Sequence, residues 1–168
     1  MAELTPRARL QPCVLDRLTD HEPETKQESR DRRVVSAGRY KNAVLRDLEM
    51  LLNSKTQPFG DSIYDFSEAA RSVLNYGIPD LCGVIVGSIN PAEIESRVKQ
   101  ALLRFEPRIL PESLSVRIIT QLDAESIRTL SFEIEGQLWA QPVPDHVFVK
   151  TEVDLESGHH TLKGESGG

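Results

Sequence analysis

The residues of this chain best suited to acid–base chemistry are carboxylates, because two well-placed acids are enough to hydrolyse a glycosidic bond. The candidates nearest a possible groove are Glu106, Glu112, Glu133 and Glu135. Glu133 and Glu135 fall on one outward strand face, where two like charges favour a solvated surface. Glu106 is expected to pair with an arginine rather than to carry a raised pKa, although the sequence does not fix its partner. We therefore assign no catalytic residue and predict that the chain is not an enzyme.

The histidines do not form a metal-binding pattern. A metal site needs three or four ligands held on rigid elements. His21 falls in a charged segment, His146 at the start of a predicted strand, and His159 and His160 near the C-terminus. No G-x-S-x-G motif, Walker loop or Rossmann glycine pattern occurs in the sequence. We expect no metal ion and no cofactor.

Length and composition are typical of one domain with tails. The 168 residues are 39% hydrophobic, which is enough for one proper core. No leader combines a basic start with an apolar run, and no segment approaches the roughly 18 apolar residues of a membrane span. Cys13 and Cys82 lie far apart and are expected to be reduced thiols, with Cys82 buried. These features predict a cytoplasmic protein.

The net charge of −6 is concentrated near the C-terminus. Residues 123–168 carry three Lys and Arg side chains against nine Asp and Glu side chains, whereas the rest of the chain is balanced. Phosphate binding requires concentrated basic side chains, so nucleic acid is a poor partner for this end. A basic protein surface would be a better one.

The N-terminal segment, residues 1–37, is predicted to be a flexible, charged arm. Its one apolar turn, at 14–18, is too short to be stable without a partner, and Leu15 and Leu18 would be its anchors. A firm helix follows at 38–53, with apolar residues at helical spacing. Asp65 and Glu68 match a capping box for a helix that should reach Gly77.

The clearest helix start is Asn90-Pro91, an Asn cap followed by proline at the first helical position. This helix is predicted to carry two outward ion pairs four residues apart, Glu93–Arg97 and Glu95–Lys99. Pro107 should end it, because proline lacks an amide donor and clashes with the preceding turn. Glu106 and Arg108 then flank a rigid kink between helix and sheet. The alternative interpretation is that this motif only ends the helix and has no further function.

Three strands are predicted after Pro111, where the apolar period changes from 3.6 to 2. They cover about 114–122, 130–135 and 147–154. The predicted fold is α+β, with N-terminal helices packed on one face of a C-terminal three-stranded antiparallel sheet. The folded domain is expected at 38–156, and the Gly-rich tail at 157–168 is expected to be disordered.

The predicted sheet has exposed edges, which invite strand addition from another chain. Phe148 points to the otherwise polar face, beside Lys150 and Glu152, where an exposed aromatic residue would suit an interface. An equally weighted alternative is that Phe148 is a lone surface residue covered by the C-terminal tail.

In four segments the chain resembles the TssE family of type VI secretion baseplate components, which is similar to the lysozyme-like wedge proteins of contractile phage baseplates. These segments are Leu15-Asp16-Arg17-Leu18, Val44 to Asn53, Ser72 to Leu81 and Phe105-Glu106-Pro107-Arg108-Ile109. Their order and spacing cover roughly residues 14 to 155. Ile78 and Ile109 stand where leucine is expected.

The resemblance implies a structural subunit at the cytoplasmic side of the inner membrane. Family members sit in the baseplate wedge with TssF, TssG and TssK, and template the first ring of the TssB–TssC contractile sheath. The family's Glu-Pro-Arg motif, here Glu106, Pro107 and Arg108, is implicated in contacts with the wedge core. We expect Arg108→Ala to abolish wedge assembly while the isolated domain stays folded.

The alternative is a peptidoglycan glycoside hydrolase. The phage-type lysozyme signature places an Asp or Cys nine residues after the catalytic Glu and a Thr six residues further on. Only Glu22 has such a partner, Asp31, and position 37 is then alanine. Both acids also fall in the charged arm, which makes hydrolysis the weaker hypothesis.

Overall fold

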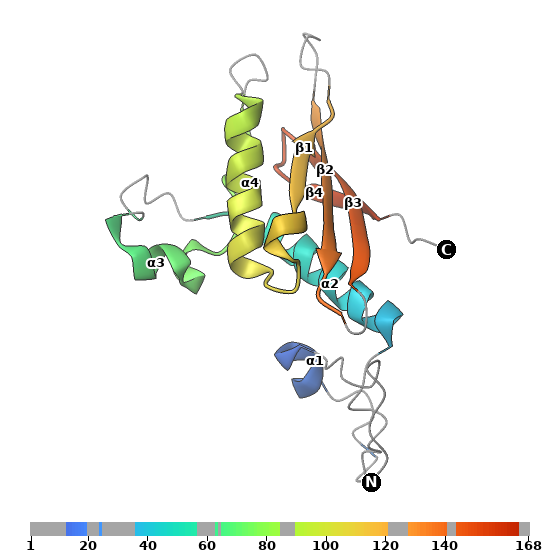
Figure 1. Cartoon of the computed structure of the whole chain (residues 1–168). Coiled ribbons are helices and arrows are strands. Elements are labelled where there is room, and N and C mark those ends of the chain that lie inside the picture. The colour runs from blue at the N-terminus through green and yellow to red at the C-terminus, as the bar shows by residue number, and fades with distance from the viewer. Residues whose placement is uncertain are drawn as a thin grey trace.

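Two helices cover one side of a four-stranded antiparallel sheet in the computed structural model (Figure 1). The helices are α2, Ala37–Leu52, and α4, Pro91–Phe105. The structure describes residues 13–19, 24, 36–56, 63, 65–84, 90–120, 128–140 and 144–164. The predicted fold class, α+β with helices packed on a C-terminal antiparallel sheet, is confirmed.

Both long helices form where their apolar stripes predict them. The Oγ atom of Ser36 accepts the amide of Arg39 and caps α2. Asn90 and Pro91 begin α4, but the Asn90 side chain makes no capping bond. Apolar side chains at helical spacing are buried along both helices, and their burial against the sheet stabilises helices of this length. They are Tyr40, Val44, Leu48, Leu51 and Leu52 in α2, and Val98, Ala101 and Leu102 in α4.

The sheet has one strand more than predicted. Its order is β1-β2-β3-β4, formed by Ser115–Ile118, Thr129–Leu138, Asp145–Asp154 and His160–Gly164. Strand β4 lies inside the segment predicted to be disordered, and it pairs with β3 from Val153↔His160 to Val149↔Gly164. Residues 165–168 of that segment, and most of the predicted arm 1–37, lie outside the described residues.

A tight turn explains why β4 returns to the sheet. The Asp154 carboxylate accepts the amides of Glu156 and Ser157, and Gly158 adopts a φ of 71° that favours glycine. His160 is then buried, and Leu162 packs against the core. Gly158 therefore forms a turn that returns the chain to the sheet.

The helix predicted from Asp65 to Gly77 is shorter. Helix α3 spans Ser67–Arg71, and its N-cap is Phe66, so the predicted capping box does not form. Ser72 interrupts the helix because its Oγ donates to the Ala69 carbonyl and accepts the Leu74 amide. The short 3₁₀ helix η4, Val73–Asn75, follows.

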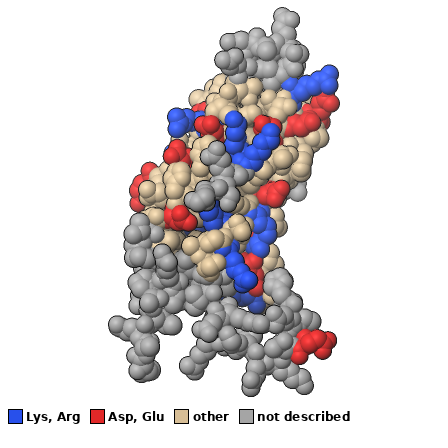
Figure 2. Space-filling model, turned by 90° about the vertical axis from the view of Figure 1, so that its right-hand side faces the viewer, with Lys and Arg blue, Asp and Glu red and all other residues tan. Residues whose placement is uncertain are grey.

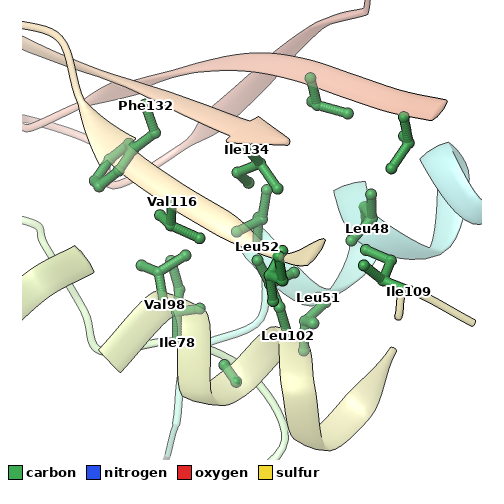
Figure 3. Packing of buried hydrophobic residues seen from close by; sticks show 14 of the residues in the cluster. Leu48, Leu51, Leu52, Ile78, Val98, Leu102, Ile109, Val116, Phe132 and Ile134 are labelled. Carbon is green, nitrogen blue, oxygen red and sulfur yellow. The ribbon is translucent and has the colours of Figure 1, made fainter. Parts of the chain in front are cut away.

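The core lies between the two helices and the sheet. Figure 3 shows side chains from α2, α4 and the strands pointing toward one another. Fully buried members include Leu48, Leu102, Phe132 and Ile134. Ile78 joins them from the loop after η4, because a bridge between Lys55 and Ile78 ties that loop to the end of α2.

Replacing Gly77 by alanine should destabilise the fold by at least about 2 kcal/mol. Gly77 has a φ of 122°, and a Cβ atom there would overlap the carbonyl oxygen of Ser54. Gly83 also has positive φ, 73°, but its Cβ would meet open space, so Gly83→Ala should cost only about 1 kcal/mol. Urea unfolding of both variants measures the difference, and equal losses would contradict this account.

Candidate partner-binding site

The segment Glu106-Pro107-Arg108 joins α4 to the sheet, as predicted. Glu106 is the C-cap of α4, and Pro107 is exposed. The backbone that follows is fastened to the end of β2: Trp139 donates its amide to the Arg108 carbonyl at 2.7 Å, and Leu110 donates to Gln137 at 2.8 Å. The 3₁₀ helix η6, Pro111–Ser113, then leads into β1.

Glu106 and Arg108 form a buried ion pair. Only 3% of Glu106 is exposed. Arg108 Nε donates to Glu106 Oε1 at 2.6 Å, and Arg108 Nη2 donates to Oε2. The backbone N–H of Arg108 adds a third bond to the same carboxylate at 3.2 Å. Within the described part of the chain, all three hydrogen bonds to the Glu106 carboxylate therefore come from one residue, two positions away.

Arg108 also reaches α2, where it extends the pair into a series of ion pairs. Its Nη2 donates to Asp47 Oδ2 at 2.7 Å. Arg46 donates to the other Asp47 oxygen through Nε at 2.9 Å and Nη2 at 2.7 Å, and its Nη1 donates to Asp16. We call Glu106, Arg108, Asp47, Arg46 and Asp16 the ion-pair chain.

The ion-pair chain favours the charged forms of Arg108 and Asp16. Burial disfavours the Arg108 cation, but the hydrogen bonds to Glu106 and Asp47 outweigh it, so the pKa of Arg108 lies above its usual value. The hydrogen bond from Arg46 is the main reason that the pKa of Asp16 lies below its usual value, with the Cys13 thiol adding a second bond.

The last member, Asp16, belongs to the short helix α1, Val14–Leu18. Helix α1 has no buried residue, and its apolar side chains are turned to solvent: Val14 is 70% exposed, Leu15 53% and Leu18 78%. A helix of five residues is not stable by itself. Asp16 thus fastens α1 to α2, and no described part of the chain covers the apolar side of α1.

A family model described as baseplate wedge protein gp25 matches residues 39–143. The match spans more than half of the sequence. This chain belongs to the baseplate wedge protein gp25 family. The family consists of structural components of the baseplate wedge. No curated protein and no solved structure is significantly similar to the chain.

The part matched by the gp25 family contains most of the ion-pair chain. Arg46, Asp47, Glu106 and Arg108 lie within residues 39–143, whereas Asp16 precedes them. Sequence analysis of this gp25-family chain predicted that Glu106 pairs with an arginine, and Arg108 is that arginine. It missed the roles of Asp16, Arg46 and Asp47, since nothing local links Asp47 to a partner 61 residues away.

The other predicted site residues of the gp25-family chain form a separate surface. Phe148, Lys150 and Glu152 lie on the polar face of β3 and are each partly buried, so Phe148 is less exposed than expected. Glu152 pairs with Lys163 of β4 at 2.7 Å. Phe148 lies opposite Glu135 in the register of β2 and β3.

Basic side chains balance the acids on this polar face. Figure 2 shows Lys and Arg side chains interspersed with Asp and Glu side chains rather than separated by sign. Glu135 lies 3.8 Å from Arg117 and 3.1 Å from His146. The excess of acidic residues in the C-terminal sequence therefore does not make this face strongly negative.

Within the described ranges of the gp25-family chain, no three His, Cys, Asp or Glu side chains are grouped so that they could hold a metal ion. Over the same ranges, no helix is long and apolar enough to cross a membrane. Cys13 and Cys82 are both free thiols, and Cys82 is exposed rather than buried as predicted, with its Sγ donating to the Glu156 carbonyl.

Proposed function

We propose that this chain is the TssE-type subunit of a type VI secretion baseplate, located at the cytoplasmic side of the inner membrane. It would sit in the wedge with TssF, TssG and TssK and join that wedge to the TssB–TssC sheath. Membership of the gp25 family and the four segments of resemblance support this proposal. The observation that carries it is the ion-pair chain, which links α1 to Glu106-Pro107-Arg108.

The wedge contact would use α1 and the junction together. Leu15 and Leu18 offer apolar side chains that nothing in the described part of the chain covers. Arg108 anchors the other end of the same ion-pair chain. A partner helix packed on α1 would bury these leucines and supply the support that a five-residue helix needs.

The sheath contact would use the sheet. Strand addition at an exposed edge would set the register of the first sheath ring through backbone hydrogen bonds, each worth about 0.5–1.5 kcal/mol net. Copies arranged around a ring would strengthen the contact through avidity. Phe148, Lys150 and Glu152 on the polar face would add selectivity.

A hydrolytic role has no comparable support. Both oxygens of the Glu106 carboxylate are bonded to Arg108, and Glu106 is buried, so the carboxylate is not placed to reach a substrate. Glu22 and Asp31, the two acids at lysozyme-like spacing, lie outside the described residues.

The test is recovery of partners by a tagged chain. Wild type should bring down TssF, TssG, TssK and the sheath subunits, quantified by mass spectrometry. Leu15→Ser with Leu18→Ser should reduce recovery of TssF and TssG at least about tenfold, because burying each leucine is worth about 1.5–3 kcal/mol. Both side chains are exposed, so the isolated domain should unfold at the same urea concentration as wild type.

The matched control is Val73→Ser with Leu74→Ser in η4. These side chains are 84% and 60% exposed, so the control removes similar apolar surface away from α1. Loss of TssF and TssG by the control alone would refute the assignment to α1. If wild type recovers neither wedge nor sheath subunits, the proposed function itself is wrong.

A further inference from the structure

We propose that the added strand joins the β4 edge, starting at Leu162, and that the Asn53 side chain determines this starting point. The proposal rests on the proposed sheath contact and specifies its edge and register. Since the strand order is β1-β2-β3-β4, an added strand has two edges to choose between. A side chain of α4 bonds to the β1 edge, and the side chain at the C-cap of α2 bonds to the β4 edge.

The β1 edge is partly closed by α4. Ile119 donates its amide to Ser131 of β2, so in an antiparallel pair the backbone of Ile118 faces away from β2. That outward amide donates to the Glu95 carboxylate of α4 at 2.8 Å. Glu95 was expected to pair with Lys99, but it protects an edge instead. A strand added here would have to displace this charged hydrogen bond.

Among the described residues, side-chain bonds close the β4 edge at its first residue, His160. Asp154 of β3 donates to the His159 carbonyl, so the backbones of His160 and Leu162 face outward. The Asn53 amide occupies both outward groups of His160: its Oδ1 accepts the His160 N–H at 2.9 Å, and its Nδ2 donates to the His160 carbonyl at 3.0 Å. Asn53 thus takes the place of one residue in a neighbouring strand.

Leu162 is the next residue along β4 whose backbone faces outward. Among the described residues, none bonds its outward N–H or carbonyl. Asn53 blocks extension of an added strand toward His160, because the backbone groups there are already paired. Asn53 therefore limits the added strand at one end, and within the described part of β4 the edge available to it runs from Leu162 to Gly164.

The surroundings of Leu162 define the chemistry of the added strand. Leu162 is partly buried against the core, so the strand should carry an apolar residue on that face. On the polar face Lys163 lies opposite Lys150 and pairs with Glu152 of β3. A carboxylate on the added strand would give Lys163 a second acidic partner at this edge. The partner segment is therefore an extended sheath strand that alternates apolar and acidic residues.

Leu162→Pro tests this edge, because proline removes the outward N–H and leaves the pairing of β4 with β3 in place. Leu162→Ala is the matched control, since it loses the same apolar side chain and keeps the N–H. In the tagged recovery experiment, Leu162→Pro should lower the yield of sheath subunits about tenfold relative to Leu162→Ala. Recovery of TssF and TssG should be equal for both variants, which also shows that both are folded.

A second measurement needs no variant. Hydrogen exchange of the wild-type chain, alone and in complex with the sheath subunits, should show slowing of the Leu162 amide by about tenfold or more. The outward amide of Val116 in β1 should be unchanged. Slowing at Val116 alone, or equal sheath recovery by Leu162→Pro and Leu162→Ala, would overturn the assignment to β4. Sheath recovery by wild type would still stand, so the proposed function would survive that outcome.

Discussion

Replacing Arg108 by alanine is expected to lower the free energy of unfolding by about 3–5 kcal/mol. The side chain of Arg108 is 18% exposed and that of Glu106 only 3%, so the variant leaves a buried carboxylate without its guanidinium partner. The Asp47 carboxylate also loses a hydrogen bond from Arg108, but it keeps the bonds that Arg46 donates. This expectation replaces the one drawn from sequence, in which the isolated domain stays folded.

Urea unfolding followed by circular dichroism measures this loss. The control is Arg128→Ala, which breaks an exposed ion pair with Glu156 and should cost less than about 0.5 kcal/mol. If Arg108→Ala unfolds at the same urea concentration as wild type, Glu106 has found other partners and the pair is not structural.

A double variant separates the charge from the partner contact. Glu106→Gln with Arg108→Ala removes both charges, and the Gln oxygen can still accept the backbone N–H of residue 108. We expect it to regain about 2 kcal/mol of the stability lost by Arg108→Ala. If this stable variant still fails to recover TssF and TssG, the charged pair acts in wedge assembly and not only in folding.

Acidification is expected to destabilise the fold through His160. Burial of its ring, 2% exposed, lowers the pKa of His160 to about 4, and the nearby His159 adds to the effect. Its Nδ1 atom has no hydrogen-bond partner among the residues that the structure describes. The unfolded chain, with a histidine pKa near 6.5, therefore binds a proton that the folded chain excludes between these two pH values.

This difference in pKa means that His160 stabilises the fold at neutral pH and loses that contribution as the pH falls. The contribution of His160 to stability is complete above about pH 6.5. Below that pH it falls by about 1.4 kcal/mol per pH unit, so the total loss is roughly 3 kcal/mol at pH 4. Carboxylates titrate in the lower part of this range, so the wild type is compared with His160→Leu at pH 7 and pH 5. The wild type should lose about 2 kcal/mol more than the variant between these pH values. Equal losses would show that burial does not lower the pKa of His160 in the folded chain.

Most of the fold could be predicted because its elements obey local rules. The stripes of α2 and α4 and the alternation of β2 and β3 reflect burial of one face, which a sequence records directly. Strand β4 could not be predicted in the same way, since its place depends on a turn stabilised by Asp154 and on contacts with Asn53. Long-range contacts of this kind have no periodic pattern.

The candidate site was predictable only in part, for the same reason. Glu106 and Arg108 are two residues apart, so their pairing is a local feature. Asp47 and Asp16 reach them through the fold, and in sequence they look like ordinary solvated charges. The segments of resemblance included both residues without indicating that they belong to one series of ion pairs.

The bond between Trp139 and Arg108 gives this protein a built-in optical reporter. Trp139 is the single tryptophan of the chain, its indole is half exposed, and its amide is bonded to the Arg108 carbonyl. Indole emission moves to shorter wavelengths when water is excluded from the ring. Docking of a wedge component over this junction can therefore be titrated by intrinsic fluorescence in an unlabelled chain, provided that the partner's own tryptophans are replaced.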